Sequence, residues 1–403
     1  MLQDNHFQRH RLILNMINHL GPISRTSLIQ HTAYRPATVG AIVSELMERK
    51  LIVESGFQSS GQGRKRVLLE INKAHICAVG VYFTPAHAAF ILSQFDGTIL
   101  RESQLPLPPK VPKKELVDTI TGHVQALLQD FSDKFFVGIG ICKPLVDPSS
   151  YRAPGLQDGF RARWIYDDLA PTLEKATGLS VEVFSGVTLP AQAEHRFGVA
   201  KGVNDFIWVE LSNGIGTSIF SGGNALGGAT GMAGELGHTV VSAGENRLCY
   251  CGKPDCVEAS AAWPALIDDI RKALQNGVIS YLQSYPVPPE ELTVQDIRKA
   301  LDAGDRMCLH HVRRAAERLG AAIANAIDLL NPALIVLYGF MLELGAHFLV
   351  PLEQSMREHA VFSSGDFQVK ISTSSESIMP LGAVANIFSA YLQTEDYRWV
   401  YRL

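Results

Sequence analysis

The segment from Gly231 to Ser260 constrains this chain most, because it concentrates one histidine and three cysteines in a single stretch. The spacing is His-x10-Cys-x-Cys-x4-Cys, from His238 through Cys249 and Cys251 to Cys256. This pattern can bring one imidazole and three thiolates onto a single tetrahedral ion, which is the ligand set of structural zinc. A disulfide pair or small buried side chains are the alternatives, but glycine and aspartate between the cysteines make poor core patterning. The segment therefore predicts a structural Zn²⁺ site.

Length and composition indicate a globular protein with more than one domain. The chain has 403 residues, of which 46% are hydrophobic and 19% are charged, as is typical of folded proteins. The sequence contains neither an apolar run of about eighteen residues nor a basic, apolar leader. We therefore expect a cytoplasmic protein without a membrane span, and in that reducing compartment clustered cysteines favour a metal over a disulfide.

Charge is distributed unevenly along the chain. Residues 1–70 carry nine Lys/Arg and five Asp/Glu, a net of +4, whereas the remainder carries 27 basic and 35 acidic residues, a net of −8. A basic N-terminal module on an acidic body predicts an anionic partner for that module alone.

The first 71 residues predict a winged helix-turn-helix domain. Apolar residues recur at i, i+3, i+4 and i+7 up to Leu20, which is typical of an amphipathic helix. Ser24 is a suitable N-cap for a second helix, and Pro36 suits the first turn of a third. We expect helices at 5–20, 24–32 and 35–50, and a wing with strands at 51–53 and 66–71 around a turn at 59–63.

Candidate DNA contacts occur in the second helix, the third helix and the wing. The third helix offers a guanidinium, a hydroxyl and a methyl group to base edges in the major groove. The other two places offer donors to phosphates or to the minor groove. The residues are Arg25, Thr26 and Ser27 in the second helix, Arg35, Thr38 and Ala41 in the third, and Arg64 and Lys65 in the wing. A solvated basic face or a protein-docking module is the alternative interpretation.

Beyond residue 72 the pattern changes to alternating strands and helices, which predicts an α/β fold whose first sheet begins as a meander. Expected strands lie at 75–81, 88–95, 98–100, 135–141, 181–184, 205–209 and 333–338, and expected helices at 114–131, 313–330 and 381–392. We divide the chain into the DNA-binding domain at 1–71, a first lobe at 72–184 plus 381–403, and a second lobe at 185–380 with the metal motif.

These residues together resemble the ROK family, in which repressors and sugar kinases share a two-lobed, actin-like ATPase fold. The matching motifs are Glu235-Leu236-Gly237-His238, Cys249-Tyr250-Cys251-Gly252 and Asp255-Cys256-Val257-Glu258. The resemblance covers essentially the whole chain, and the N-terminal winged helix is similar to the repressor branch, of the N-acetylglucosamine- or xylose-repressor type. It implies a two-lobed ROK body behind the DNA-binding domain.

The resemblance also implies that Glu235, His238 and Glu258 hold the hydroxyl groups of a sugar. The chemistry of these residues agrees with that role, because carboxylates accept bonds from sugar hydroxyls and a zinc-bound histidine can donate from its other ring nitrogen. The alternative for the two glutamates is exposure to solvent, or local pairing with Lys253 or Arg247.

Two positions depart from the kinase members of the family. Kinases carry an Asp-x-Gly-Gly-Thr phosphate turn, where this chain has Tyr82, Thr84 and Pro85, and proline removes a backbone donor. They also carry an Asn-Asp pair whose aspartate is the general base, where this chain has Ser185 and Gly186. We therefore expect no catalytic residue and no kinase activity.

Together these observations predict a DNA-binding transcription regulator, more specifically a repressor, with a catalytically degenerate sugar-binding body. We expect operator DNA and a sugar or sugar phosphate as its partners, and a homodimer or homotetramer as its assembly. The alternatives are a ROK sugar kinase, a regulator whose effector is a protein, and a zinc-dependent scaffold.

Overall fold

The computed structural model describes residues 2–32, 34–58, 65–83, 87–107, 111–143, 165–185, 188–241, 244–284, 288, 291–361, 367–373 and 377–393. Contacts divide them into two compact units, one from 1–144, 161–189 and 376–403 and the other from 190–375. No helix among these residues is long and apolar enough to cross a bilayer.

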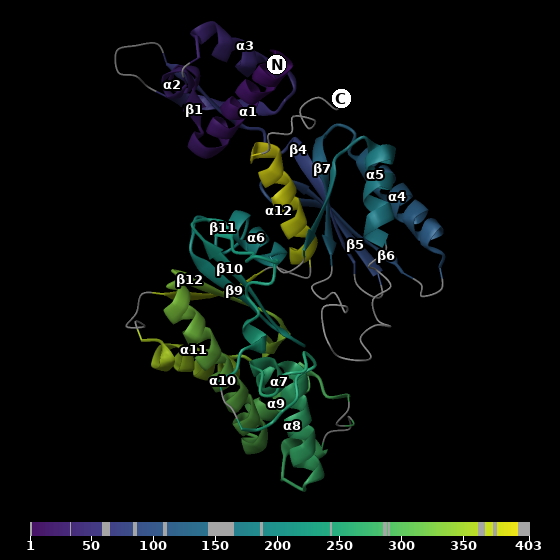
Figure 1. The fold of residues 1–403 in the computed structure, drawn as a ribbon, viewed down its shortest axis with the longest axis vertical. Coiled ribbons are helices and arrows are strands. Elements are labelled where there is room, and N and C mark those ends of the chain that lie inside the picture. The colour runs from purple at the N-terminus through teal and green to yellow at the C-terminus, as the bar shows by residue number, and fades with distance from the viewer. Residues whose placement is uncertain are drawn as a thin grey trace. The chain divides into compact units, whose positions relative to one another are not determined.

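The N-terminal module consists of three helices and a sheet of order β1-β3-β2 (Figure 1). Ser24 caps the second helix, because its side chain accepts a hydrogen bond from the Ser27 amide. The wing strand β2 is longer than predicted and changes register between Glu54 and Gly56, where glycine has a φ of 145°. The elements are α1 (Leu2–Leu20), β1 (Ile23–Ser24), α2 (Arg25–His31), α3 (Pro36–Glu48), β2 (Ile52–Gln58) and β3 (Arg66–Ile71). The predicted winged helix-turn-helix is confirmed.

The same unit contains a five-stranded sheet of order β6-β5-β4-β7-β8. Strands β4, β5 and β6 form the predicted antiparallel meander, and β7 and β8 continue it in parallel. Helices α4 and α5 pack on one face and α12 on the other (Figure 1). The bounds are β4 (Ile76–Phe83), β5 (His87–Gln94), β6 (Ile99–Pro106), α4 (Lys113–Asp130), β7 (Phe135–Lys143), α5 (Ile165–Thr177), β8 (Val181–Ser185) and α12 (Ile378–Gln393).

Helix α12 lies at backbone distance from two neighbours, because glycine leaves room at its contact with β4 and at its contact with the chain at Leu189. A Cβ atom at Gly80 of β4 would lie 2.2 Å from the Pro380 carbonyl oxygen. A Cβ atom at Gly382 of α12 would lie 2.0 Å from the Leu189 carbonyl oxygen. The helix begins at Ile378, earlier than predicted, since proline is tolerated in the first turn.

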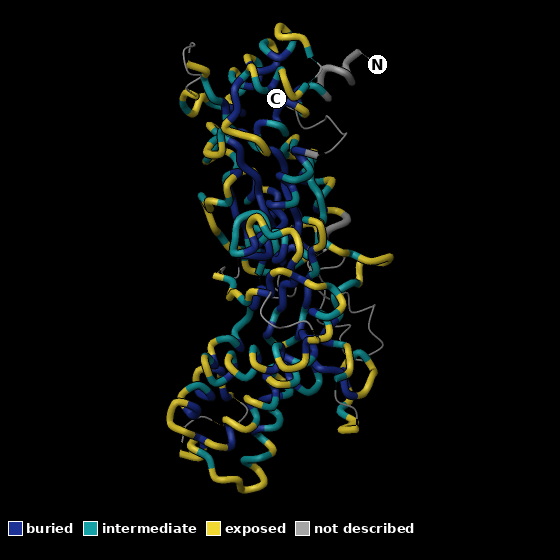
Figure 2. Tube along the Cα trace, turned by 90° about the vertical axis from the view of Figure 1, so that its left-hand side faces the viewer, coloured by how far each residue is buried: buried dark blue, intermediate teal, exposed yellow. Residues whose placement is uncertain are grey.

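The second unit is built on a sheet of order β11-β10-β9-β12-β13 and has a core of buried apolar residues. Buried residues are dark blue in Figure 2. Helix α10 begins at Arg306 and not at Arg313 as predicted, because the Asp305 side chain accepts the Cys308 amide and caps it. The elements are α6 (Leu189–Arg196), β9 (Phe206–Leu211), β10 (Ile215–Ser221), β11 (Asn224–Ala225), η4 (Leu236–His238), α7 (Val257–Ala261), α8 (Trp263–Gln275), η5 (Tyr281–Ser284), α9 (Val294–Asp302), α10 (Arg306–Leu330), β12 (Leu334–Tyr338), η7 (Phe340–Leu344), α11 (Ala346–His359) and β13 (Gln368–Ile371).

The α12 contact predicts opposite effects for two glycine-to-alanine changes. Gly382→Ala should lower the free energy of unfolding by about 1–3 kcal/mol, because the new methyl group meets a backbone oxygen. Gly122→Ala, in helix α4, is the matched control and should raise it by about 0.5–1 kcal/mol, since no atom lies within 4 Å of the added Cβ. Chemical denaturation measures both, and an equal response to the two changes would contradict the packing described.

Candidate functional site

The four predicted metal ligands converge in the second unit. A ring nitrogen of His238 and the three Sγ atoms all lie within 4.8 Å of one another. His238 Nδ1 is 3.6 Å from Cys249 Sγ, and Cys251 Sγ is 3.6 Å from Cys256 Sγ. Zinc bonds of about 2.3 Å to sulfur and about 2.0 Å to nitrogen give tetrahedral edges of about 3.5–3.8 Å, so these residues fit the ion. The sulfur separation is far longer than the roughly 2.05 Å of a disulfide, so none joins Cys251 and Cys256.

Asp255 organises the loop that carries the cysteines. Its side chain is 9% exposed and accepts hydrogen bonds from the Gly244 amide at 2.8 Å and the Arg247 amide at 3.0 Å. Its own backbone is left-handed, with a φ of 58°, a conformation that aspartate tolerates better than most residues. Arg247 in turn donates to Asp269 of α8 at 3.1 Å. These hydrogen bonds tie the cysteine loop to its own backbone and to α8.

A second anchor holds the same loop to α10. The Glu245 carboxylate accepts hydrogen bonds from Arg314 and Arg318 on successive turns of that helix. Burial alone would raise the pKa of Glu245, but the two guanidinium groups outweigh it and lower the pKa. The carboxylate therefore stays charged and paired.

The two ring nitrogens of His238 face different groups. Nδ1 faces the thiols, whereas Nε2 lies 3.2 Å from the Tyr250 hydroxyl and 3.7 Å from Glu235 Oε2. A ligand bond at Nδ1 fixes the tautomer in which Nε2 carries the proton. The two predicted roles of His238, metal ligand and sugar contact, would therefore use different ring nitrogens.

Glu258 is the most confined of the predicted sugar contacts. It is 8% exposed, its Oε2 accepts the Ile215 amide at 2.8 Å, and its Oε1 has no hydrogen-bond partner among the described residues. Gly214 lies so close that a Cβ atom there would be 2.9 Å from Oε2. The alternative of local pairing is not observed, because Lys253 donates to the His238 carbonyl and Arg247 to Asp269.

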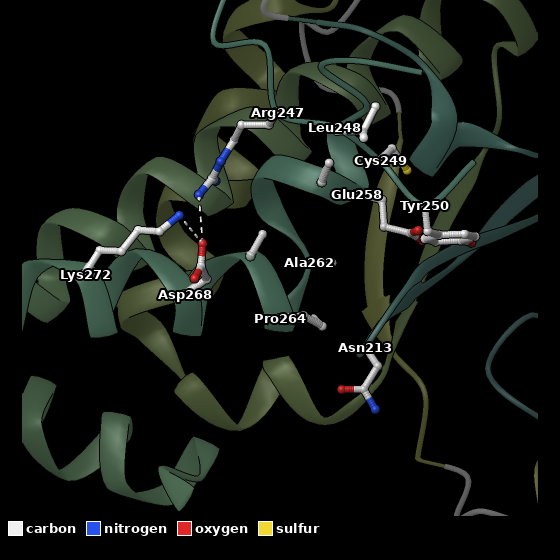
Figure 3. Close-up of a pocket in the computed structure, with 12 residues that line it drawn as sticks. Asn213, Arg247, Leu248, Cys249, Tyr250, Glu258, Ala262, Pro264, Asp268 and Lys272 are labelled. Carbon is white, nitrogen blue, oxygen red and sulfur yellow. Dashed lines mark hydrogen bonds and ion pairs between the residues drawn. The ribbon is translucent and has the colours of Figure 1, made fainter. Parts of the chain in front are cut away.

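Glu258, whose Oε1 has no partner among the described residues, lines a pocket of about 460 Å³ in the second unit (Figure 3). Asn213 and Tyr250 lie at the same end of this pocket as Glu258 (Figure 3). Glu235 and His238 are not among its lining residues, and His238 is connected to it through the Tyr250 hydroxyl. The structure thus brings one of the three predicted sugar contacts directly into the pocket.

Sequence reasoning missed Glu210, Asn213 and Tyr250. Burial raises the pKa of Glu210, a hydrogen bond from Ser212 lowers it, and the nearby charge of Glu258 raises it further. Tyr250 stands between two ligand cysteines in the sequence, which was a signal that it would face the same site. Glu210 is brought to Glu258 by the β9–β10 hairpin, and no local pattern in the sequence marks it.

In the DNA-binding module, the outer surface of α3 carries the predicted base contacts. Val39, Ile42, Val43 and Leu46 are buried on its inner face, whereas Arg35 and Ala41 are exposed and Thr38 is half-buried. This side of the helix is the one that can enter a major groove.

The other predicted DNA contacts differ in how exposed they are to solvent. Thr26 and Lys65 are exposed, whereas Arg25 is half-buried and donates to the Met47 sulfur at 3.3 Å. The Ser27 amide and hydroxyl both bond Ser24 within the helix cap. Arg64 lies outside the described residues.

The positions at which the sequence departs from the kinase pattern also fall mostly outside the described residues. Thr84, Pro85 and Gly186 are not described, while Tyr82 lies near the end of β4 and Ser185 ends β8.

The loop geometry predicts distinct roles for the backbone and the side chain of Asp255. Asp255→Gly keeps the left-handed backbone but removes both acceptors, so the Gly244 and Arg247 amides should exchange with solvent at least about tenfold faster. Asp255→Asn retains one acceptor and should protect at least one of the two amides. Hydrogen exchange of the intact protein measures this, and unchanged protection in the glycine variant would refute the proposed anchor.

Comparison with known proteins identifies the family of this fold. The ROK family model matches residues 79–385. The xylose repressor of Caldicellulosiruptor bescii is 27% identical over 96% of both chains, and the DNA-binding transcriptional dual regulator NagC of Escherichia coli K12 is 29% identical over 87% of this chain and 84% of its own.

Solved structures agree with this result. A ROK family transcriptional regulator, described as a homolog of the E. coli MLC protein, superposes with a TM-score of 0.79 at 25% identity and covers 99% of each chain. The ROK hexokinase of Thermus thermophilus superposes with a TM-score of 0.62 at 25% identity and covers 76% of this chain and 97% of its own. With its winged helix-turn-helix domain followed by a two-lobed, actin-like body, this chain belongs to the ROK family.

Proposed function

We propose that this protein is a sugar-responsive, DNA-binding transcriptional repressor whose ROK body binds ligand without catalysis. One observation carries the proposal. The chain combines helix α3, whose outer face is exposed for reading DNA, with Glu258, a buried carboxylate that lines a pocket and has one oxygen without a partner among the described residues. The relatives named above as repressors and regulators support it. The proposed domains are 1–71 for DNA, and 72–184 plus 381–403 with 185–380 for the ligand-binding body.

The sugar would be held by hydrogen bonds of both directions. Glu258 Oε1 accepts a hydroxyl proton, because burial without a partner leaves it in need of a donor. His238 Nε2 donates, and the half-exposed Glu235 beside it accepts. Because Glu235 and His238 do not line the pocket, a ligand that meets all three would extend from Glu258 past Tyr250 toward them, and a free sugar or a sugar phosphate has the adjacent hydroxyl groups for this.

Zinc would act as a brace in this site and not as a catalyst. His238, Cys249, Cys251 and Cys256 would hold the ion, and four protein ligands leave no open position for water or substrate. When bound, the ion keeps the thiols deprotonated and the loop closed. The residues around it orient His238 and place Tyr250 at the pocket.

We infer that the chain does not transfer phosphoryl groups, which separates it from the sugar-kinase alternative. Glycine at position 186 cannot act as a general base, and Pro85 supplies no backbone N–H to a phosphate. The Ile215 amide, in the glycine-rich turn at 213–217 that resembles a second phosphate loop of the kinases, already donates to Glu258. A protein effector remains the alternative to a sugar.

Repression would require two copies of the reading helix. Helix-turn-helix proteins bind pseudopalindromic operators as dimers, with one recognition helix in each half-site. We propose that the protein binds its operator as a homodimer or homotetramer in the cytoplasm. Ligand then weakens DNA binding only as far as it prefers the conformation that does not bind DNA.

The proposed function predicts that a sugar releases the protein from DNA. Full-length protein should shift DNA that flanks its own gene, and one sugar or sugar phosphate of a screened panel should reverse the shift. Glu258→Gln should raise the concentration needed by at least about tenfold, because the charged acceptor is lost while the shape is kept. Arg35→Ala should weaken DNA binding about tenfold or more without sugar, whereas Arg313→Ala, an exposed arginine of the second unit, should not.

Two outcomes would contradict this assignment. If no panel member changes DNA binding, the effector is not a sugar. If incubation with Mg-ATP yields a phosphorylated sugar and Glu258→Ala abolishes it, the protein is a kinase.

The proposed role of zinc predicts both its presence in the protein and the effect of losing it. Purified protein should contain one zinc ion per chain by mass spectrometry, and Cys251→Ser should lose most of it. That variant should still bind operator DNA but should respond weakly to the sugar, because the loop that places His238 and Tyr250 is loosened. Cys308→Ala, outside the cluster, is the control and should keep the ion. A full sugar response from metal-free protein would refute the brace.

A further inference from the structure

The pocket that contains Glu258 continues well beyond the predicted sugar contacts. It runs along α8, where Pro264 and Lys272 both line it (Figure 3). Lys272 lies eight positions after Pro264 in the helix, which corresponds to about 12 Å along the helix axis. A volume of about 460 Å³ lies within the range of sites for ligands of moderate size. A single pyranose ring held at Glu258 leaves the α8 end of this pocket empty.

The middle of the pocket is lined by apolar side chains. Its wall on the metal loop is formed by Leu248 and Tyr250, which are 76% and 40% exposed despite their size. Its floor on α7 and α8 consists of small side chains and proline, including Ala262, Pro264 and Ala265. Flat aromatic and aliphatic surfaces of this kind contact the C–H faces of sugar rings, and small floor residues leave room for the ring.

The far end of the pocket is polar but nearly neutral in charge. Lys272 Nζ donates to Asp268 Oδ2 at 2.6 Å, and an Arg247 nitrogen lies 3.8 Å from the same carboxylate (Figure 3). Arg247 is balanced by Asp269, so the four side chains carry two positive and two negative charges. Such a network presents both donors and acceptors to hydroxyl groups, whereas a phosphate would meet no excess of positive charge.

We propose that this α8 end is a second carbohydrate subsite, so that the effector is a disaccharide or longer oligosaccharide rather than a monosaccharide. The ring at Glu258 occupies the first subsite, and the next ring lies between Tyr250 and Ala265 with its hydroxyls toward Asp268 and Lys272. This inference rests on the proposed function, because it takes the first ring to be a sugar bound at Glu258. It also assigns a second task to the metal loop, which supplies one wall of the subsite.

Matched sugar pairs test the subsite on the full-length protein. Isothermal titration compares xylose with xylobiose, glucose with cellobiose, and N-acetylglucosamine with its β-1,4-linked dimer. For the pair that binds, the disaccharide should bind at least about tenfold more tightly, as one or two added hydrogen bonds provide. Ala265→Leu, which fills the floor, and Asp268→Asn should each reduce that preference to less than about threefold while leaving the monosaccharide affinity unchanged.

The control is Gln275→Leu, which places the same side chain on the same helix outside the pocket and should preserve the preference. Equal affinity for monosaccharide and disaccharide, or equal weakening of both by Ala265→Leu, overturns the second subsite and leaves the proposed function intact. Binding of no sugar at all, with operator binding retained, overturns the sugar-responsive function and this inference together.

Discussion

The hydrogen bond from the Ile215 amide to Glu258 is the interaction on which the site depends. It joins the β9–β10 hairpin to α7 and holds a carboxylate at 8% exposure with its other oxygen unpartnered among the described residues. An incompletely paired buried carboxylate costs about 1–3 kcal/mol or more. The charge of Glu258 also raises the pKa of the nearby Glu210, so the arrangement is unfavourable for folding alone, which supports the proposed ligand that donates to Oε1.

The loop that carries Cys249, Cys251 and Cys256, here called the metal loop, also forms part of the pocket wall. Asp255 and Glu245 hold the loop to its own backbone and to α10, so the loop has anchors in addition to the four predicted metal ligands. The same fixed loop sets His238 with one nitrogen toward the thiols and the other toward Tyr250. A change in the loop would therefore move His238 and the pocket wall at the same time.

Local signals allowed the sequence to predict the DNA-binding module, but not the shape of the pocket. Ser24 as a cap and the inner face of α3 follow from nearest neighbours on a helix, and both were confirmed. The four predicted metal ligands lie within 19 residues of one another in the chain, which made their convergence predictable. The pocket combines Asn213, Tyr250 and Asp268 through non-local packing. The start of α10 at Arg306 was missed because its cap, Asp305, lies eight residues before the expected start of the helix.

Within the first unit, α12 connects the sheet to the DNA-binding module through few but directed contacts. Its Leu392 carbonyl accepts hydrogen bonds from Asn15 at 2.9 Å and Arg11 at 3.1 Å, both on α1. A cation at a helix C-terminus is also favoured by the helix dipole. Two such bonds contribute about 1–3 kcal/mol in total, which is the usual size of allosteric coupling and far below the stability of a domain. Under the proposed function, a link of this strength would bias the position of helix α3 and would break when a ligand stabilises another arrangement.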